Sequence, residues 1–237
     1  MSVPLVVLRP EPGLSETMAA ARAQGLEAIG APLWTIEPVA WDAPAVGGFD
    51  AILLGSASAV RHGGPALERF MGLPVHAVGE RTAAAARGAG FGIASVGSGG
   101  LQSLLDTLAG PLRLLRLAGE ERVLLATRPG VTIEERVVYR ACPLSLAGEA
   151  VGALCAGAVA ALHSASAARR LGEECDRLGI ARGAVALAAL APAIAEAAGS
   201  GWLAVRTAPA VTDAALLALA AELCQKPRGY AAGHDRD

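Results

Sequence analysis

Residues 51–59 read AILLGSASA, four apolar residues followed by a glycine and two serines. A short apolar run of this kind is typical of a buried strand, and a serine just after it is a preferred helix N-cap. Similar runs recur along the chain and alternate with alanine-rich helical stretches. This alternation is typical of parallel sheets covered by helices on both faces, so the sequence predicts an α/β fold.

The same pattern gives the individual elements. We expect strands at residues 5–9, 26–29, 51–54, 75–78, 112–117, 133–140, 158–162, 185–189 and 202–205. Helices fit between most of them, for example at residues 13–24, 81–89, 166–178 and 211–224.

A second segment resembles AILLGSASA. Residues 163–167 read HSASA, and they also follow an apolar strand. After each copy come a glycine or proline turn, an alanine-rich helix, a short strand and a leucine-rich helix, the last beginning near Leu101 and near Ala214. Two lobes of like fold would produce this pairing. Coincidence among generic strand and helix units, inflated by alanine, is the alternative.

Composition excludes several kinds of function. The net charge is −2 and there is no basic cluster, which argues against nucleic acid and anionic membranes as partners. The single lysine of the sequence, Lys226, lies in a polar tail, 226–237, that we expect to be disordered. Lysine-dependent covalent catalysis therefore lacks its residue. The four cysteines are far apart, and no signal peptide or membrane-spanning run is recognisable, so we expect a cytoplasmic protein.

Small polar residues follow three of the expected strands. They are Ser56 and Ser58, Gly79 and Thr82, and Ser164 and Ser166. Each of them, taken singly, is most often a helix cap without any ligand. Three such junctions together would form a row of amide and hydroxyl donors, which suits a ligand with several carboxylates.

Other residue types offer fewer candidates. Arg9 closes the first expected strand, where it either binds a carboxylate or pairs with an acidic neighbour. Tyr139 lies late in the strand at 133–140, where it is either a packing residue or a proton donor. The histidines have no ligand spacing, so we expect no metal, and the glycines at 97–100 do not form a dinucleotide fingerprint.

Several segments, taken in order, resemble the uroporphyrinogen-III synthase family. They are VLRPE at 7–11, GLE at 25–27 with Pro32, FDAILLGS at 49–56, VGERTA at 78–83 with Gly90 and Phe91, the strand ending in Gly119 and Glu120, and VVYR at 137–140. The resemblance covers roughly residues 3–224. Two departures stand out: Ala191-Pro192-Ala193-Ile194 replaces a stretch with paired threonines, and residues 120–133 are too short for a full helix, so we expect a trimmed lobe there.

The resemblance implies two similar α/β lobes with parallel sheets, joined by a two-stranded connector. Lobe 1 would comprise residues 1–35 and 145–225, lobe 2 residues 40–137, and the connector residues 34–39 and 138–144. Two lobes would leave a cleft between them and would be expected to close on a ligand.

The implied activity is that of a cyclising hydro-lyase of tetrapyrrole biosynthesis, the route to haem, chlorophyll and cobalamin. It would act without cofactor or metal on hydroxymethylbilane, a linear tetrapyrrole polycarboxylate, as a monomer. Tyr139 would help the hydroxyl depart, while Arg9, Ser56, Ser58, Gly79, Thr82, Ser164 and Ser166 would bind carboxylates. The alternatives are a two-lobed small-anion binding module without catalysis and, opposed by the missing glycine fingerprint, a dinucleotide-dependent oxidoreductase.

Overall fold

The computed structural model of the protein describes residues 2–146 and 148–225. Contacts within the chain divide it into two compact units. Unit 1 contains the residues up to 35 and from 143 onward, and unit 2 contains residues 36–142. The tail at 226–237, expected to be disordered, lies outside the described residues.

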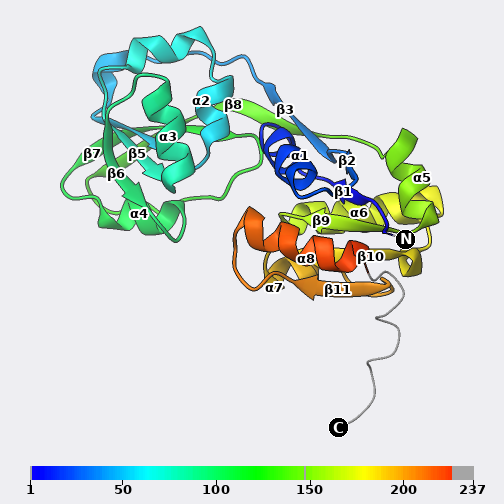
Figure 1. The fold of residues 1–237 in the computed structure, drawn as a ribbon. Coiled ribbons are helices and arrows are strands. Elements are labelled where there is room, and N and C mark those ends of the chain that lie inside the picture. The colour runs from blue at the N-terminus through cyan, green and yellow to red at the C-terminus, as the bar shows by residue number, and fades with distance from the viewer. Residues whose placement is uncertain (1, 147, 226–237) are drawn as a thin grey trace. The chain divides into compact units, whose positions relative to one another are not determined.

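Unit 1 is built on a sheet whose strands occur in the order β11-β10-β9-β1-β2 (Figure 1). Its elements are β1 (Leu5–Val7), α1 (Gly13–Ala23), β2 (Ala28–Gly30), α5 (Gly148–Ala156), β9 (Ala158–Leu162), α6 (Ala165–Leu178), a 3₁₀ turn (Arg182–Ala184), β10 (Val185–Ala189), α7 (Pro192–Ala197), β11 (Ala204–Thr207) and α8 (Asp213–Gln225). All the neighbouring strands pair in parallel. Counted along unit 1, the spatial order is 2-1-3-4-5, which is the flavodoxin-like arrangement.

Unit 2 is built on a sheet with the order β3-β8-β7-β4-β5-β6. Its elements are β3 (Trp34–Pro38, which starts in unit 1), a 3₁₀ turn (Val46–Gly48), β4 (Ala51–Leu54), α2 (Ala57–His62), a second 3₁₀ helix (Pro65–Phe70), β5 (Val75–Val78), α3 (Glu80–Gly88), β6 (Ile93–Gly97), α4 (Leu101–Thr107), β7 (Leu112–Gly119) and β8 (Val131–Pro143). The strands from β8 to β6 pair in parallel. If β7 is counted as the first strand, they also follow the order 2-1-3-4-5, so unit 2 is a circular permutation of the fold of unit 1.

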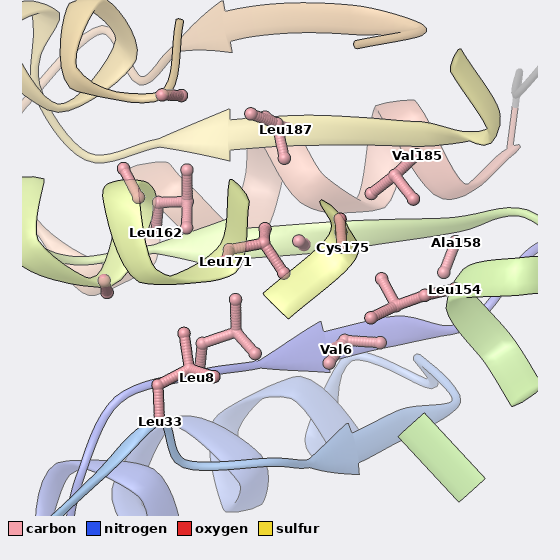
Figure 2. Close-up of a cluster of buried hydrophobic side chains, with 14 of the residues drawn as sticks. Val6, Leu8, Leu33, Leu154, Ala158, Leu162, Leu171, Cys175, Val185 and Leu187 are labelled. Carbon is pink, nitrogen blue, oxygen red and sulfur yellow. The ribbon is translucent and has the colours of Figure 1, made fainter. Parts of the chain in front are cut away.

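Alternating side chains of the unit 1 sheet form a separate core on each face. Val6 and Leu8 point to the face covered by α5, α6 and α7, where they join Leu171 and Leu187 (Figure 2). Leu5 and Val7 point to the opposite face, which α1 and α8 cover. A strand buried on both faces must be apolar at every position, which explains why β1, β9 and β10 are continuous apolar runs.

Unit 2 has the same two-faced arrangement, with three α-helices where the described part of unit 1 has five. α2, α3 and the second 3₁₀ helix cover one face, with Phe70 in its core. On the other face, α4 packs through Leu101, Leu104 and Leu105. The connection from β7 to β8 corresponds to the one that contains α1 in unit 1, but residues 120–130 form no helix. Among the described residues, α4 is therefore the only helix that contributes to the core on this face.

These findings confirm the expected fold class, two mostly parallel α/β sheets flanked by helices. Several element boundaries differ from the expectation by one to three residues, and two of them have a clear structural cause. β11 begins at Ala204, two residues late, because Trp202 is buried and its indole nitrogen donates to the Ala198 carbonyl at 2.9 Å. β8 runs as one strand from Val131 to Pro143, longer than the expected 133–140, since both β7 and β3 pair with it.

Burial in the unit 1 core gives a direct stability prediction. Val185 is fully buried in β10, whereas Val211 is 71% exposed in the same unit. We expect Val185→Ala to lower the free energy of unfolding by about 2 kcal/mol, because it removes buried methyl groups and leaves a cavity. Val211→Ala, the same chemical change at the surface, should change it by less than about 0.5 kcal/mol. Denaturant unfolding measures both, and equal effects would contradict the assigned burial.

Candidate functional site

The order of the strands shows where each unit can bind a ligand. In a flavodoxin-like sheet the chain leaves the first and third strands toward opposite faces, and ligands bind beyond the carboxyl ends of these two strands. In unit 2 these are β7 and β4, and in unit 1 they are β1 and β9. The two units differ at this position.

In unit 2 this position is an open pocket of about 250 Å³. It is lined by the end of β4 (Gly55, Ser56), the end of β5 (Val78), the start of α4 (Gly100, Leu101), the second half of β7 (Arg116, Leu117, Ala118, Gly119), the following segment (Glu121, Arg122, Val123) and Tyr139 of β8. Ser56 and Tyr139, which sequence reasoning selected separately, therefore line one pocket.

A β-bulge directs Tyr139. The pairing of β7 with β8 shifts register between Ala118 and Gly119, so that Ala118 faces Val137 and Gly119 faces Tyr139. As a result Val138 and Tyr139, although consecutive, pack against the same core, which regular alternation of side chains would prevent. Bulges commonly re-aim a side chain beside an active site.

The Tyr139 ring also requires a glycine opposite it. A Cβ atom added at Gly119 would lie 2.7 Å from the Tyr139 Cε2 and Cζ atoms and 3.0 Å from its hydroxyl oxygen. Any larger residue would push the ring away from the end of β7. Gly119 is thus part of the structure that places the phenol at the pocket.

Arg116 and Arg122, which line the pocket, belong to a charged cluster with Glu135. Arg116 is only 3% exposed, and its Nη1 donates to Glu135 Oε1 at 2.5 Å and to the Val123 carbonyl at 2.9 Å. Arg122 donates through Nε to Glu135 Oε2 at 2.8 Å. Burial by itself raises the pKa of the Glu135 carboxyl, but the hydrogen bond from Arg122 and the charge of Arg116 outweigh burial and hold that pKa below its usual value. Glu135 is therefore ionised at neutral pH and shared by two guanidinium groups.

In unit 1 the corresponding position is filled by the protein's own side chains. Arg9, just beyond β1, donates to Asp213 Oδ2 at 2.6 Å and to Thr17 Oγ1 at 3.1 Å. His163, just beyond β9, has its Nε2 atom 3.5 Å from Asp213 Oδ1. The structure thus shows Arg9 in an ion pair with an acidic residue, one of the two interpretations of this position.

The expected serines act as helix caps in the structure. The Ser56 hydroxyl accepts from the Ser58 amide at 3.2 Å, and the Ser164 hydroxyl accepts from the Ala167 amide at 3.2 Å. Ser166 lies beside Ser164, with 3.1 Å between the hydroxyl oxygens. Capping does not exclude ligand binding, because a serine oxygen can accept and donate at the same time.

Gly79 and Thr82 stand at the start of α3. Gly79 is the N-cap residue with a φ of 75°, in the left-handed region, and Thr82 is 5% exposed. The Thr82 amide already donates to the Gly79 carbonyl at 3.1 Å. Neither residue lines the pocket of unit 2.

Sequence reasoning missed Arg116, Arg122 and Glu135, and it missed Asp213 as the partner of Arg9. A signal for Arg116 was present, since it interrupts an otherwise apolar half of an expected buried strand. Charged residues are almost never fully buried unless they are paired, so an arginine at that place predicts a partner. The partner itself, Glu135, comes from the neighbouring strand and is visible only in the fold.

No metal centre is found within residues 2–146 and 148–225, where no group of three or more potential ligand side chains comes together. All four cysteines are free. Burial raises the pKa of the Cys175 and Cys224 thiols to about 11, so both remain protonated at neutral pH. None of the helices within the described ranges is long and apolar enough to span a membrane.

The fold and the pocket define a class: a protein of two flavodoxin-like units, one with an arginine-containing pocket at the carboxyl ends of its strands. Comparison with known proteins narrows the class. The sequence profile of the family described as uroporphyrinogen-III synthase HemD matches residues 15–218. The chain belongs to the uroporphyrinogen-III synthase family.

Solved structures agree with this assignment at the level of the fold. The chain is similar to uroporphyrinogen-III synthetase from Helicobacter pylori, with a TM-score of 0.63 at 16% identity, covering 93% of this chain and 99% of that one. It is also similar to a mutant uroporphyrinogen III synthase from the extremely thermophilic bacterium Thermus thermophilus, with a TM-score of 0.55 at 19% identity, covering 94% of this chain and 100% of that one. The search of curated proteins gave no match.

The charged cluster predicts a pH-dependent stability. We expect Glu135→Gln to lower the free energy of unfolding at neutral pH by about 1–3 kcal/mol, because an amide cannot compensate the buried charge of Arg116. The pKa of Glu135 is lower in the folded than in the unfolded protein. Its contribution is therefore complete above the unfolded value of about 4.3 and is lost as the pH falls through the folded value.

Denaturant titrations at a series of pH values from about 7 to about 3 test this linkage. The difference between wild type and Glu135→Gln should shrink toward the acid end. Glu134→Gln is the matched control, because Glu134 lies on the same strand with a side chain that is 44% exposed. A difference that stays constant down to the lowest pH would show that the Glu135 charge does not stabilise the fold.

Proposed function

We propose that the protein closes hydroxymethylbilane into uroporphyrinogen III, with inversion of the last pyrrole ring and loss of water, as a cyclising hydro-lyase of tetrapyrrole biosynthesis. Two observations support the proposal: the family match over residues 15–218, and the pocket that combines Tyr139 with Ser56 at the ends of parallel strands. The second carries it, because it brings a proton donor and a polar binding surface to one place.

The reaction does not require a covalent bond between the substrate and the protein. The substrate hydroxyl leaves as water after accepting a proton, and the resulting cation is attacked by the substituted carbon of the last ring. The spiro intermediate reopens and recloses with that ring inverted, and a ring proton is then released. Closure without the enzyme gives the uninverted isomer, so the protein must chiefly hold one geometry and assist the proton transfer.

Tyr139 is proposed as the acid that assists departure of the hydroxyl. The hydroxyl of a tyrosine can donate a hydrogen bond to a leaving oxygen. The bulge at Ala118 and Gly119 supports this role, because it directs the Tyr139 ring to the pocket.

Carboxylate binding is proposed for the other residues that the sequence selected, at the ends of the strands in both units. They are Arg9, Ser56, Ser58, Gly79, Thr82, Ser164 and Ser166. Ser56 has direct support from its place in the pocket, whereas Arg9 would first have to share or release Asp213.

We also propose the expected division into lobe 1 (1–35 and 145–225), lobe 2 (40–137) and connector (34–39 and 138–144), and a cytoplasmic monomer. Support for the connector comes from hydrogen bonds of the Leu144 amide to the Leu33 carbonyl at 2.8 Å and of the Val39 amide to the Val138 carbonyl at 3.0 Å. Light scattering of the purified protein tests the monomer.

Incubation of the pure protein with fresh hydroxymethylbilane tests the function. We expect the type III isomer to predominate in the oxidised products separated by chromatography. Binding of the bilane with only the uninverted isomer formed would favour the anion-binding module instead.

Tyr139→Phe tests the mechanism. The ring and its contact with Gly119 are kept while the hydroxyl is lost, so the fold should be unchanged. We expect formation of the type III isomer to slow by roughly 100-fold, the usual lower range for loss of a general acid, with a larger share of the uninverted isomer. Unchanged rate and isomer ratio would remove Tyr139 from the mechanism.

A further inference from the structure

Arg116 is a buried guanidinium that the protein satisfies only in part. Its Nη1 donates to Glu135 and to the Val123 carbonyl. Its Nε is buried and has no hydrogen-bond partner, and no hydrogen bond of Nη2 occurs within residues 2–146 and 148–225. Buried N–H groups without a partner are rare in native proteins, because each costs free energy relative to the solvated group.

The two unused donors lie on the same edge of the guanidinium. Nε and Nη2 present parallel N–H groups, and this edge matches the two oxygens of a carboxylate. Glu135 occupies only the far end of the group, at Nη1, so the edge suited to two-point binding is left for another acceptor.

The local charge also favours an anion. Glu135 is shared by Arg116 and Arg122, which places two positive groups around one carboxylate. Glu121 also lines the pocket, but it is exposed, so water screens its charge more strongly than that of the buried Arg116.

The volume of the pocket limits the size of the group that it can bind. Its volume of about 250 Å³ lies below the range of roughly 300–1,000 Å³ usual for whole small-molecule ligands. A four-ring substrate would therefore place only a part of itself there, and the part that suits an arginine is an acidic side arm.

We propose that the Nε and Nη2 edge of Arg116 binds one acetate or propionate carboxylate of the substrate, and that Glu135 holds the guanidinium in position for it. Binding at this point places the ring that carries the arm beside Tyr139, which lines the same pocket. The inference rests on the proposed function and adds a binding residue to it.

The test compares Arg116→Met with the double variant Arg116→Met/Glu135→Gln. The double variant leaves no unpaired buried charge, so it keeps the fold even if the single variant is unstable. We expect both to raise the KM for hydroxymethylbilane about 10- to 100-fold, because a charge-assisted two-point contact is lost. Arg116→Lys, which keeps the charge but not the flat edge, should recover only part of this loss.

Arg113→Met is the matched control. Arg113 lies on the same strand, pairs with Asp50 and has a side chain that is 55% exposed, so its loss should leave KM unchanged. Synthetic bilanes that each lack one acidic arm identify the bound group. For the bilane without the arm that Arg116 binds, wild type and double variant should have equal KM.

The outcomes separate the inference from the function on which it rests. A wild-type enzyme that forms the type III isomer, together with a folded double variant of unchanged KM, would overturn the role of Arg116 alone. A wild-type protein that forms no type III isomer would overturn the proposed function, and the inference with it.

Discussion

Parallel strands pair with their carboxyl ends at the same edge of a sheet, and both faces of such a sheet must be covered. This constraint governs each unit of the protein. It requires continuous apolar strands such as β4, β9 and β10, and it requires helices on both faces. It also brings the ends of β4 and β7 to one edge. There Ser56, just after β4, and Tyr139, opposite Gly119 at the end of β7, line one pocket although they are far apart in the chain.

The two units have the same strand order but differ at the position beyond the first and third strands. In unit 1 the position beyond the first and third strands holds Arg9, Asp213 and His163, so the protein supplies its own carboxylate to its own arginine. In unit 2 the corresponding position is an open pocket, and Arg116 is among the residues that line it. Residues 120–130, which follow β7, form no helix, and the Val123 carbonyl of this segment accepts a hydrogen bond from Arg116 Nη1.

Burial of the Arg116 guanidinium costs free energy, which other interactions of the fold must offset. A buried guanidinium is stable only if its charge and its donors are compensated. Glu135 compensates the charge, while the buried Nε has no hydrogen-bond partner within residues 2–146 and 148–225. The stability of unit 2 and the proposed binding of a substrate carboxylate are therefore linked through Glu135, which both neighbouring arginines share.

The sequence by itself determined the α/β class, most of the strands and helices, the pairing of two similar halves and the capping serines at 56 and 164, because burial periodicity and capping are local properties. Only the tertiary structure decided which of the candidate residues share a pocket, that Arg9 is paired with Asp213, and that Tyr139 turns toward β7. These features depend on strand order and on a one-residue shift of register between β7 and β8. Strand order and register are set by contacts between segments distant in the chain, which no local pattern encodes.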